Sequence, residues 1–142
     1  MKKRVSTLLV AVALLTTAGS ATLSAAPQKQ QKPFLIQGKL PHLTMMVKMM
    51  WDDKDLALTP KQKEELLKIR KETIGSAKAL GKKIFALEDR VAQESQMGVE
   101  PQKLKKYVDE IAKYRAEATM VHLRCIYNTR KVLTQEQLDI LE

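Results

Sequence analysis

Side chains that bind soft metal ions gather in two short parts of this sequence, around residues 42–50 and residues 120–125. Thioether and thiolate sulfur favours Cu(I), and histidine with cysteine also suits Zn. If the two parts lie on antiparallel neighbouring helices, their ligands can meet. The competing interpretation is that methionines at helical spacing form adaptable apolar packing, and that a cysteine among apolar residues is a small hydrophobic side chain. The residues in question are His42, Met45, Met46, Met49 and Met50 in the first part, and Met120, His122 and Cys125 in the second.

Basic side chains form a second candidate site between these two parts, where they outnumber the acids. On exposed helix faces such charges are usually only solubilising. Here they lie beside methionine and tyrosine positions, and a positive surface with adaptable apolar patches can attract and hold unfolded chains of varied sequence. Besides the methionines at positions 45, 46, 49 and 50, the candidate residues of this client-binding surface are Lys78, Lys82, Lys83, Arg90, Lys105, Lys106, Lys113 and Arg124.

Catalytic motifs are absent from the sequence, and we expect no enzyme. There is no glycine-rich phosphate loop, no His-Glu-x-x-His and no serine in a nucleophile elbow. The adjacent acids at 64–65 and 88–89 fit solvated helix faces, where a lysine four residues on is the ordinary partner, as Lys68 is for Glu64. The prediction is therefore no catalytic residue and no obligatory cofactor, with Zn or Cu as the alternative.

A Leu-Thr-x-x-Gln pattern occurs twice, at residues 58–62 and 133–137, and each copy predicts the start of a helix. The threonine at the N-cap accepts a hydrogen bond from the N3 backbone N–H, and the glutamine reaches back to the N-cap N–H. The leucine before each threonine is placed to hold the entering chain. We therefore assign an architectural role to Leu58, Thr59, Gln62, Leu133, Thr134 and Gln137.

The elements that must position these residues are helices throughout. We predict a short helix at residues 42–51, long helices at about 60–97 and 101–131, and a last helix after the second motif. Gly98 and Pro101 separate the long helices, and so short a connection makes them antiparallel neighbours. Their apolar seam has spacings of three and four residues. It consists of Ala77, Leu80, Ile84, Leu87 and Val91 on one helix, and of Leu104, Val108, Ile111, Ala118, Val121 and Cys125 on the other, with Arg115 at one seam position.

The expected fold is thus all-α, a long antiparallel helical hairpin with short flanking helices. A single hairpin leaves one flank of its second helix partly bare. A second copy would cover that flank, so we expect a cradle-shaped homodimer. The side chains concerned are Tyr107, Tyr114, Met120, Leu123 and Tyr127.

The N-terminus has the pattern of a secretory signal. Three basic residues precede an apolar stretch and then small residues, which predicts a signal peptide at 1–25 with its cut between 21 and 26. A flexible leader at 26–40 and one helical domain at 41–142 follow. No later stretch predicts a membrane span. After cleavage, 22 basic residues face 16 acids, a net charge of about +6.

The predicted export determines which partners this positive charge suits. A bacterial periplasm excludes nucleic acid as the expected partner and favours acidic proteins or anionic surfaces. The single cysteine, Cys125, forms no disulfide within the chain.

These features together resemble the Spy/CpxP family of periplasmic proteins. The resemblance covers about residues 41–142. It rests on the two Leu-Thr-x-x-Gln motifs, on Met-Met-Val-Lys at 45–48 before Leu-Ala-Leu-Thr at 56–59, and on Met-Val-His at 120–122 leading through Tyr-Asn at 127–128 to the second motif. The charged Arg115 departs from a plain apolar stripe.

The resemblance implies an ATP-independent chaperone, a dimer that holds unfolded or misfolded envelope proteins during stress and suppresses their aggregation. It leaves two alternatives open. One is a metal-binding or metal-resistance protein, as in relatives of the ZraP and CnrX type. The other is a regulator of the CpxP type that docks on the periplasmic domain of a sensor kinase.

Overall fold

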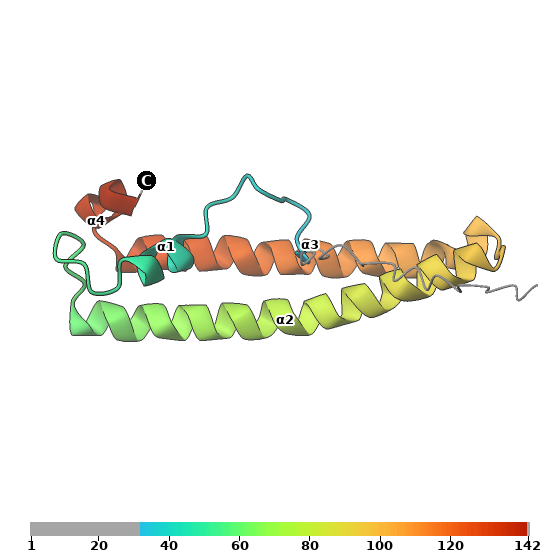
Figure 1. The fold of residues 1–142 in the computed structure, drawn as a ribbon, viewed down its shortest axis with the longest axis horizontal. Helices are drawn as coiled ribbons and strands as arrows, with labels where there is room; N and C mark the ends of the chain where they lie inside the picture. Colours follow the sequence, from blue (N-terminus) through green and yellow to red (C-terminus); the bar gives the residue numbers. More distant parts are fainter. Residues whose placement is uncertain (1–31, 142) are drawn as a thin grey trace, which may run out of the picture. The chain divides into compact units, whose positions relative to one another are not determined.

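The computed structural model describes residues 32–141, and all regular structure in this range is helical (Figure 1). The predicted signal peptide and the start of the leader lie outside the described residues. The helices are α1 (Leu43–Met49), α2 (Pro60–Gln96), α3 (Pro101–Val132) and α4 (Gln135–Leu141). The two long helices pack side by side along the hairpin, so the predicted all-α antiparallel hairpin is confirmed. Between residues 32 and 141, no helix has the length and apolarity needed to cross a membrane.

The turn between α2 and α3 follows from local backbone chemistry. Gly98 has φ 78°, a left-handed conformation that glycine adopts without steric cost. The N–H of Gly98 donates to the Ser95 carbonyl at 3.0 Å, and the N–H of Val99 donates to the Glu94 carbonyl at 3.1 Å. This pair of bonds is the Schellman arrangement that satisfies the last carbonyls of a helix. Pro101 then occupies the first turn of α3, where its missing N–H costs nothing.

The hairpin core is formed by the seam between α2 and α3. Leu80 and Ile84 are buried on α2, and Leu104, Ala118, Val121 and Cys125 are buried on α3. The prediction that Val108 belongs to this seam was wrong, because its side chain is 50% exposed. On α3, Leu104, Ala118 and Cys125 are buried and Ile111 is half-buried at the same spacing of seven. A second row falls three residues later, on the half-buried Tyr107 and Tyr114 and on Val121.

A second apolar cluster lies at the open end of the hairpin, where α1 and α4 fold back onto the long helices (Figure 1). The turn before α2 is fixed by Asp53, whose Oδ1 accepts the N–H groups of Asp55 (2.9 Å) and Leu56 (3.1 Å). Ala57 then takes φ 44°, which is unusual for a residue with a side chain. The buried members of the cluster are Val47, Leu56, Leu66, Leu133, Leu138 and Leu141.

Candidate functional site

Both Leu-Thr-x-x-Gln motifs form the predicted capping boxes. In the first, the Gln62 N–H donates to Thr59 Oγ1 at 3.2 Å, and the Thr59 N–H donates to Gln62 Oε1 at 3.0 Å. In the second, the Gln137 N–H donates to Thr134 Oγ1 at 3.2 Å, and the Thr134 N–H donates to Gln137 Oε1 at 3.1 Å. Each motif therefore fixes where its helix begins, α2 in one case and α4 in the other.

The same two glutamines also bind each other across the open end, which sequence reasoning missed. Gln62 Nε2 donates to Gln137 Oε1 at 2.8 Å and to the Val132 carbonyl at 2.9 Å. Gln137 Nε2 donates to the Leu56 carbonyl at 2.8 Å and contacts Gln62 Oε1 at 3.3 Å. Gln62 thus serves the N-terminus of α2 and the C-terminus of α3 together. The motifs form one joint that ties four chain segments.

The methionines of α1 divide into two pairs. Met46 and Met50 pack against the open-end cluster. Met45 and Met49 are 47% and 81% exposed, so they alone offer apolar surface to a partner. This division follows the helix period, because residues three or four apart share a face. The predicted quartet is therefore half core and half surface.

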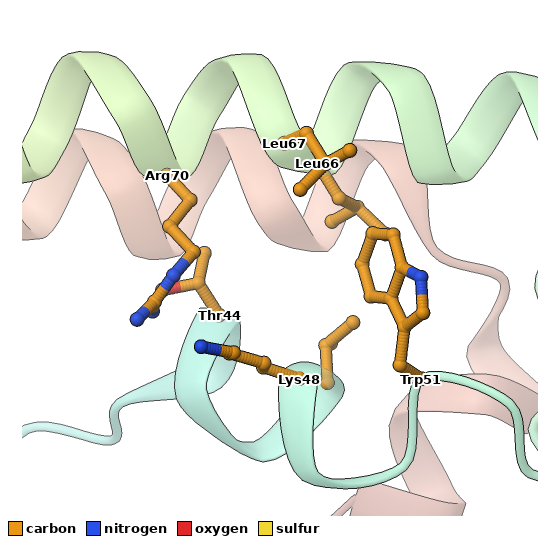
Figure 2. A pocket seen from close by; sticks show the side chains of 7 residues that line it. Thr44, Lys48, Trp51, Leu66, Leu67 and Arg70 are labelled. Atoms are coloured by element: carbon orange, nitrogen blue, oxygen red, sulfur yellow. The ribbon is translucent and has the colours of Figure 1, made fainter.

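A pocket between α1 and α2 adds an apolar site that the sequence did not single out. Its volume is about 320 Å³, and its apolar lining consists of Val47, Trp51, Leu66 and Leu67. Figure 2 shows the Trp51 indole at one end and Arg70 with Thr44 at the other, with Lys48 between them on α1. An apolar hollow with cationic side chains beside it suits an apolar side chain from an acidic segment.

The eight basic residues predicted for the client-binding surface are all exposed. Several cations lie over aromatic rings: Arg90 is 4.3 Å and Lys106 is 4.7 Å from the centroid of Tyr107, and Lys83 is 5.1 Å from that of Tyr114. Two also have acidic partners, Glu94 for Arg90 (2.7 Å) and Asp109 for Lys105 (2.6 Å). The result is a mixed cationic and aromatic surface along α2 and α3. The exposed set is Lys78, Lys82, Lys83, Arg90, Lys105, Lys106, Lys113 and Arg124.

The structure brings the two histidines together. The rings of His42 and His122 stack with centroids 4.7 Å apart and planes at 17°. Burial is the main cause that lowers the pKa of each ring. At His42, the charge of Lys32 lowers the pKa further. At His122, the neighbouring His42 lowers it further, whereas a bond to the Pro41 backbone raises it. Both imidazoles are therefore favoured in the neutral form, the form that binds metal.

The remaining predicted metal ligands do not complete this pair. Met120 is 50% exposed, whereas His122 is buried. Cys125 is buried with its thiol 3.9 Å from the Thr44 hydroxyl. No group of three His, Cys, Asp or Glu side chains suited to a metal occurs within residues 32–141. The lone pairs of nearly parallel stacked rings also run side by side instead of converging, so a shared ion requires one ring to turn.

Residues 32–36 lie on the hairpin, and their contacts were not predicted. The N–H of Leu35 donates to Thr119 Oγ1 at 2.8 Å, and Arg115 Nη1 donates to the Lys32 carbonyl at 3.1 Å. Arg115 also pairs with Glu88 of α2 through its Nε at 3.1 Å and its Nη2. The charged seam position therefore has both a partner acid on the facing helix and a backbone acceptor from residues 32–36.

Comparison with known proteins adds no relative: no family model, no curated protein and no solved structure matches this chain. The likeness to the Spy/CpxP family therefore depends on the motifs quoted above.

Proposed function

We propose that this protein is an ATP-independent periplasmic chaperone, which holds unfolded or misfolded envelope proteins on a basic, partly apolar surface and suppresses their aggregation during stress. The observation that carries the proposal is the mixture of exposed cations and exposed apolar side chains along the same helices. Met49, Leu67, Met97 and Val108 are all at least half exposed. Isolated exposed apolar residues are ordinary on any protein, but here cations accompany them over most of the hairpin.

The two kinds of side chain have different tasks in this mechanism. Long-range positive charge speeds the encounter with a client and weakens with salt. Adaptable methionine and aromatic side chains then hold apolar segments of varied sequence. Nothing in this scheme requires a nucleotide, so binding and release depend on the client's own folding. A homodimer formed through the partly bare flank of α3 would cover that flank and bring the remaining surfaces of two copies together.

The test measures light scattering from a reduced, aggregating model protein with and without a molar excess of the purified chain at low salt. We expect the chain to lower the light scattering of the model protein, and added salt to raise that scattering again. The triple variant Lys78→Glu, Lys82→Glu and Lys113→Glu should slow client capture by about tenfold. The control variant Lys61→Glu, Lys68→Glu and Lys71→Glu changes the net charge equally but leaves the eight basic residues of the predicted client-binding surface unchanged. Unchanged scattering with the unsubstituted chain would refute the chaperone proposal.

Metal binding is a second candidate, favoured by one observation. Nδ1 of His122 is buried, and within residues 32–141 no hydrogen bond of ordinary geometry reaches it. A ring turn that exposed this nitrogen would let His42 and His122 bind one Zn or Cu(I) ion together. Isothermal titration of the chain with each metal tests this: heat at micromolar metal that disappears in His122→Phe supports it, and no heat removes it.

A further inference from the structure

Residues 32–36 lie against the hairpin as a bent segment that is neither helix nor strand, and main-chain groups attach it. The hydroxyl of Thr119 accepts the Leu35 N–H, and the Arg115 guanidinium donates to the Lys32 carbonyl. Thr119 Oγ1 is kept in place by its own bond to the Arg115 carbonyl at 2.8 Å. Because both bonds to the segment involve backbone atoms, any residue except proline at position 35 could make them. This mode of attachment is independent of sequence.

A side chain between these two bonds supplies the apolar contact. Phe34 packs against Leu80, Ala118 and Val121, with Tyr114 beside it. Its ring also stacks on His122 with centroids 4.9 Å apart. We call this place the aromatic slot. It consists of Leu80, Tyr114, Ala118, Val121 and His122, together with the two backbone-binding residues Arg115 and Thr119.

The attachment is partial, which makes it reversible. Phe34 is only half-buried, and the next two side chains, Leu35 and Ile36, are 57% and 42% exposed. Two main-chain bonds, one aromatic contact, the bond between Lys32 Nζ and His42 Nε2 at 3.1 Å and the Pro33 side chain beside Gly81 form a small interface compared with a stable protein–protein contact. Another non-helical segment with an aromatic residue can therefore replace this one.

We infer that the aromatic slot is a binding site for non-helical polypeptide segments that present an aromatic side chain, and that residues 32–36 occupy it as an internal competitor. Occupation of the slot by residues 32–36 concerns this chain alone. The identification of the displacing segment as an unfolded client rests on the proposed function. An internal occupant lowers the apparent affinity for an external one by the fraction of molecules in which the slot is open. Removing the internal aromatic should therefore raise the affinity.

The experiment measures fluorescence anisotropy of a labelled peptide with the sequence of residues 32–38 against three purified proteins. They are the unsubstituted chain, Phe34→Ala, and Leu35→Ala as the matched control on the same segment. We expect Phe34→Ala to bind the peptide about tenfold more tightly, since burying a phenylalanine side chain changes an equilibrium by that order. Leu35→Ala should stay close to the unsubstituted chain, because its side chain is exposed and only its backbone makes the bond.

Two modified peptides test the contacts without altering the protein. A peptide with alanine at the position of Phe34 should bind Phe34→Ala at least about tenfold more weakly. A peptide methylated on the nitrogen at the position of Leu35 lacks the donor for Thr119 and should also bind more weakly. The inference is overturned if Phe34→Ala binds no better than Leu35→Ala, or if all three peptides bind alike. Circular dichroism confirms that each protein keeps its helices.

The same proteins separate this inference from the proposed function. If the peptide results hold but no variant reduces light scattering of the model client, the slot stands and the chaperone proposal fails. If scattering falls but the peptides do not discriminate, clients bind elsewhere and the slot inference fails alone. If both hold, Phe34→Ala should also suppress aggregation at a lower concentration than Leu35→Ala.

Discussion

The bond between Gln62 and Gln137 predicts that the two motifs stabilise the fold as a unit and not as separate helix caps. The perturbation is alanine at each position and at both together. Gln137 is buried, 8% exposed, and it supplies the hydrogen bond to the carbonyl of Leu56, which is itself fully buried. Gln62 is half-buried, so water can replace part of what it loses. The two substitutions should therefore differ in cost.

The magnitudes follow from these contacts. Gln137→Ala leaves the Leu56 carbonyl buried without a partner, which costs about 1–3 kcal/mol, and it removes the return bond to the Thr134 N–H, which costs about 1 kcal/mol more. We expect a loss of about 3 kcal/mol in the free energy of unfolding. Gln62→Ala should lose about 1–2 kcal/mol. Because each single variant already breaks the Gln–Gln bond, the double variant should lose about 1 kcal/mol less than their sum.

The assay is urea unfolding followed by circular dichroism at one fixed protein concentration, since any self-association makes the midpoint depend on concentration. Gln135→Ala is the matched control, because this glutamine is exposed in the same turn of α4 and its Nε2 donates to the exposed Asp139 Oδ1 at 2.7 Å. It should change stability by less than about 0.5 kcal/mol. A coupling energy between Gln62 and Gln137 below about 0.3 kcal/mol would show that the motifs act independently and would refute this reasoning.

Three further predictions concern other parts of the molecule. Folding lowers the pKa of His42 and His122 below the ordinary value of 6.5, so the unfolded chain binds more protons than the folded chain just below pH 6.5. The free energy of unfolding should therefore be level above pH 6.5 and fall as the pH drops below it. Urea unfolding across pH measures this fall, which should be smaller in His122→Phe. Ala57→Gly should raise stability by up to about 1 kcal/mol because it relieves the strain of a positive φ. Ala86→Gly, inside α2, should lower stability by about 1 kcal/mol. Thermal unfolding that ranks the two variants the other way contradicts the strain argument. Arg115→Leu should change stability by less than about 1 kcal/mol. Introduced into the Phe34→Ala protein, it should weaken binding of the residue 32–38 peptide several-fold. Equal peptide affinity with and without Arg115→Leu would exclude a role for the guanidinium.

The helices could be predicted from the sequence because their limits depend on neighbours along the chain. Thr59 with Gln62 starts α2, and Gly98 with Pro101 ends one long helix and starts the next. These interactions join residues only a few positions apart, so the residue types and their spacing are enough to predict them. The fold class followed directly, since two long helices with so short a connection pack against each other.

The contacts between distant segments could not be predicted in the same way. The capping boxes already explain why a glutamine stands at positions 62 and 137, so nothing in the sequence indicates that the two side chains also bind each other. Phe34 lies in a segment with no hydrophobic period, and a single aromatic residue there does not indicate what it packs on. The prediction for Val108 was wrong for a related reason. An apolar residue four positions after Leu104 fits the seam, but Tyr107, Tyr114 and Val121 form that row instead.

Arg115 connects the architecture of the hairpin to its proposed task. A hydrophobic residue at this seam position would pack the long helices more simply, because a charge near the core has to be desolvated and paired. The chain pairs it with Glu88 on the facing helix, and its side chain remains only 17% exposed. That pair leaves a guanidinium nitrogen free to donate to the Lys32 carbonyl. An extended backbone brings its own polar groups to an apolar surface, and each buried one needs a partner. Arg115 and Thr119 supply one donor and one acceptor beside the place where an aromatic ring packs, so the interruption of the seam is what allows the hairpin to hold residues 32–36, as we propose it holds a segment of a client.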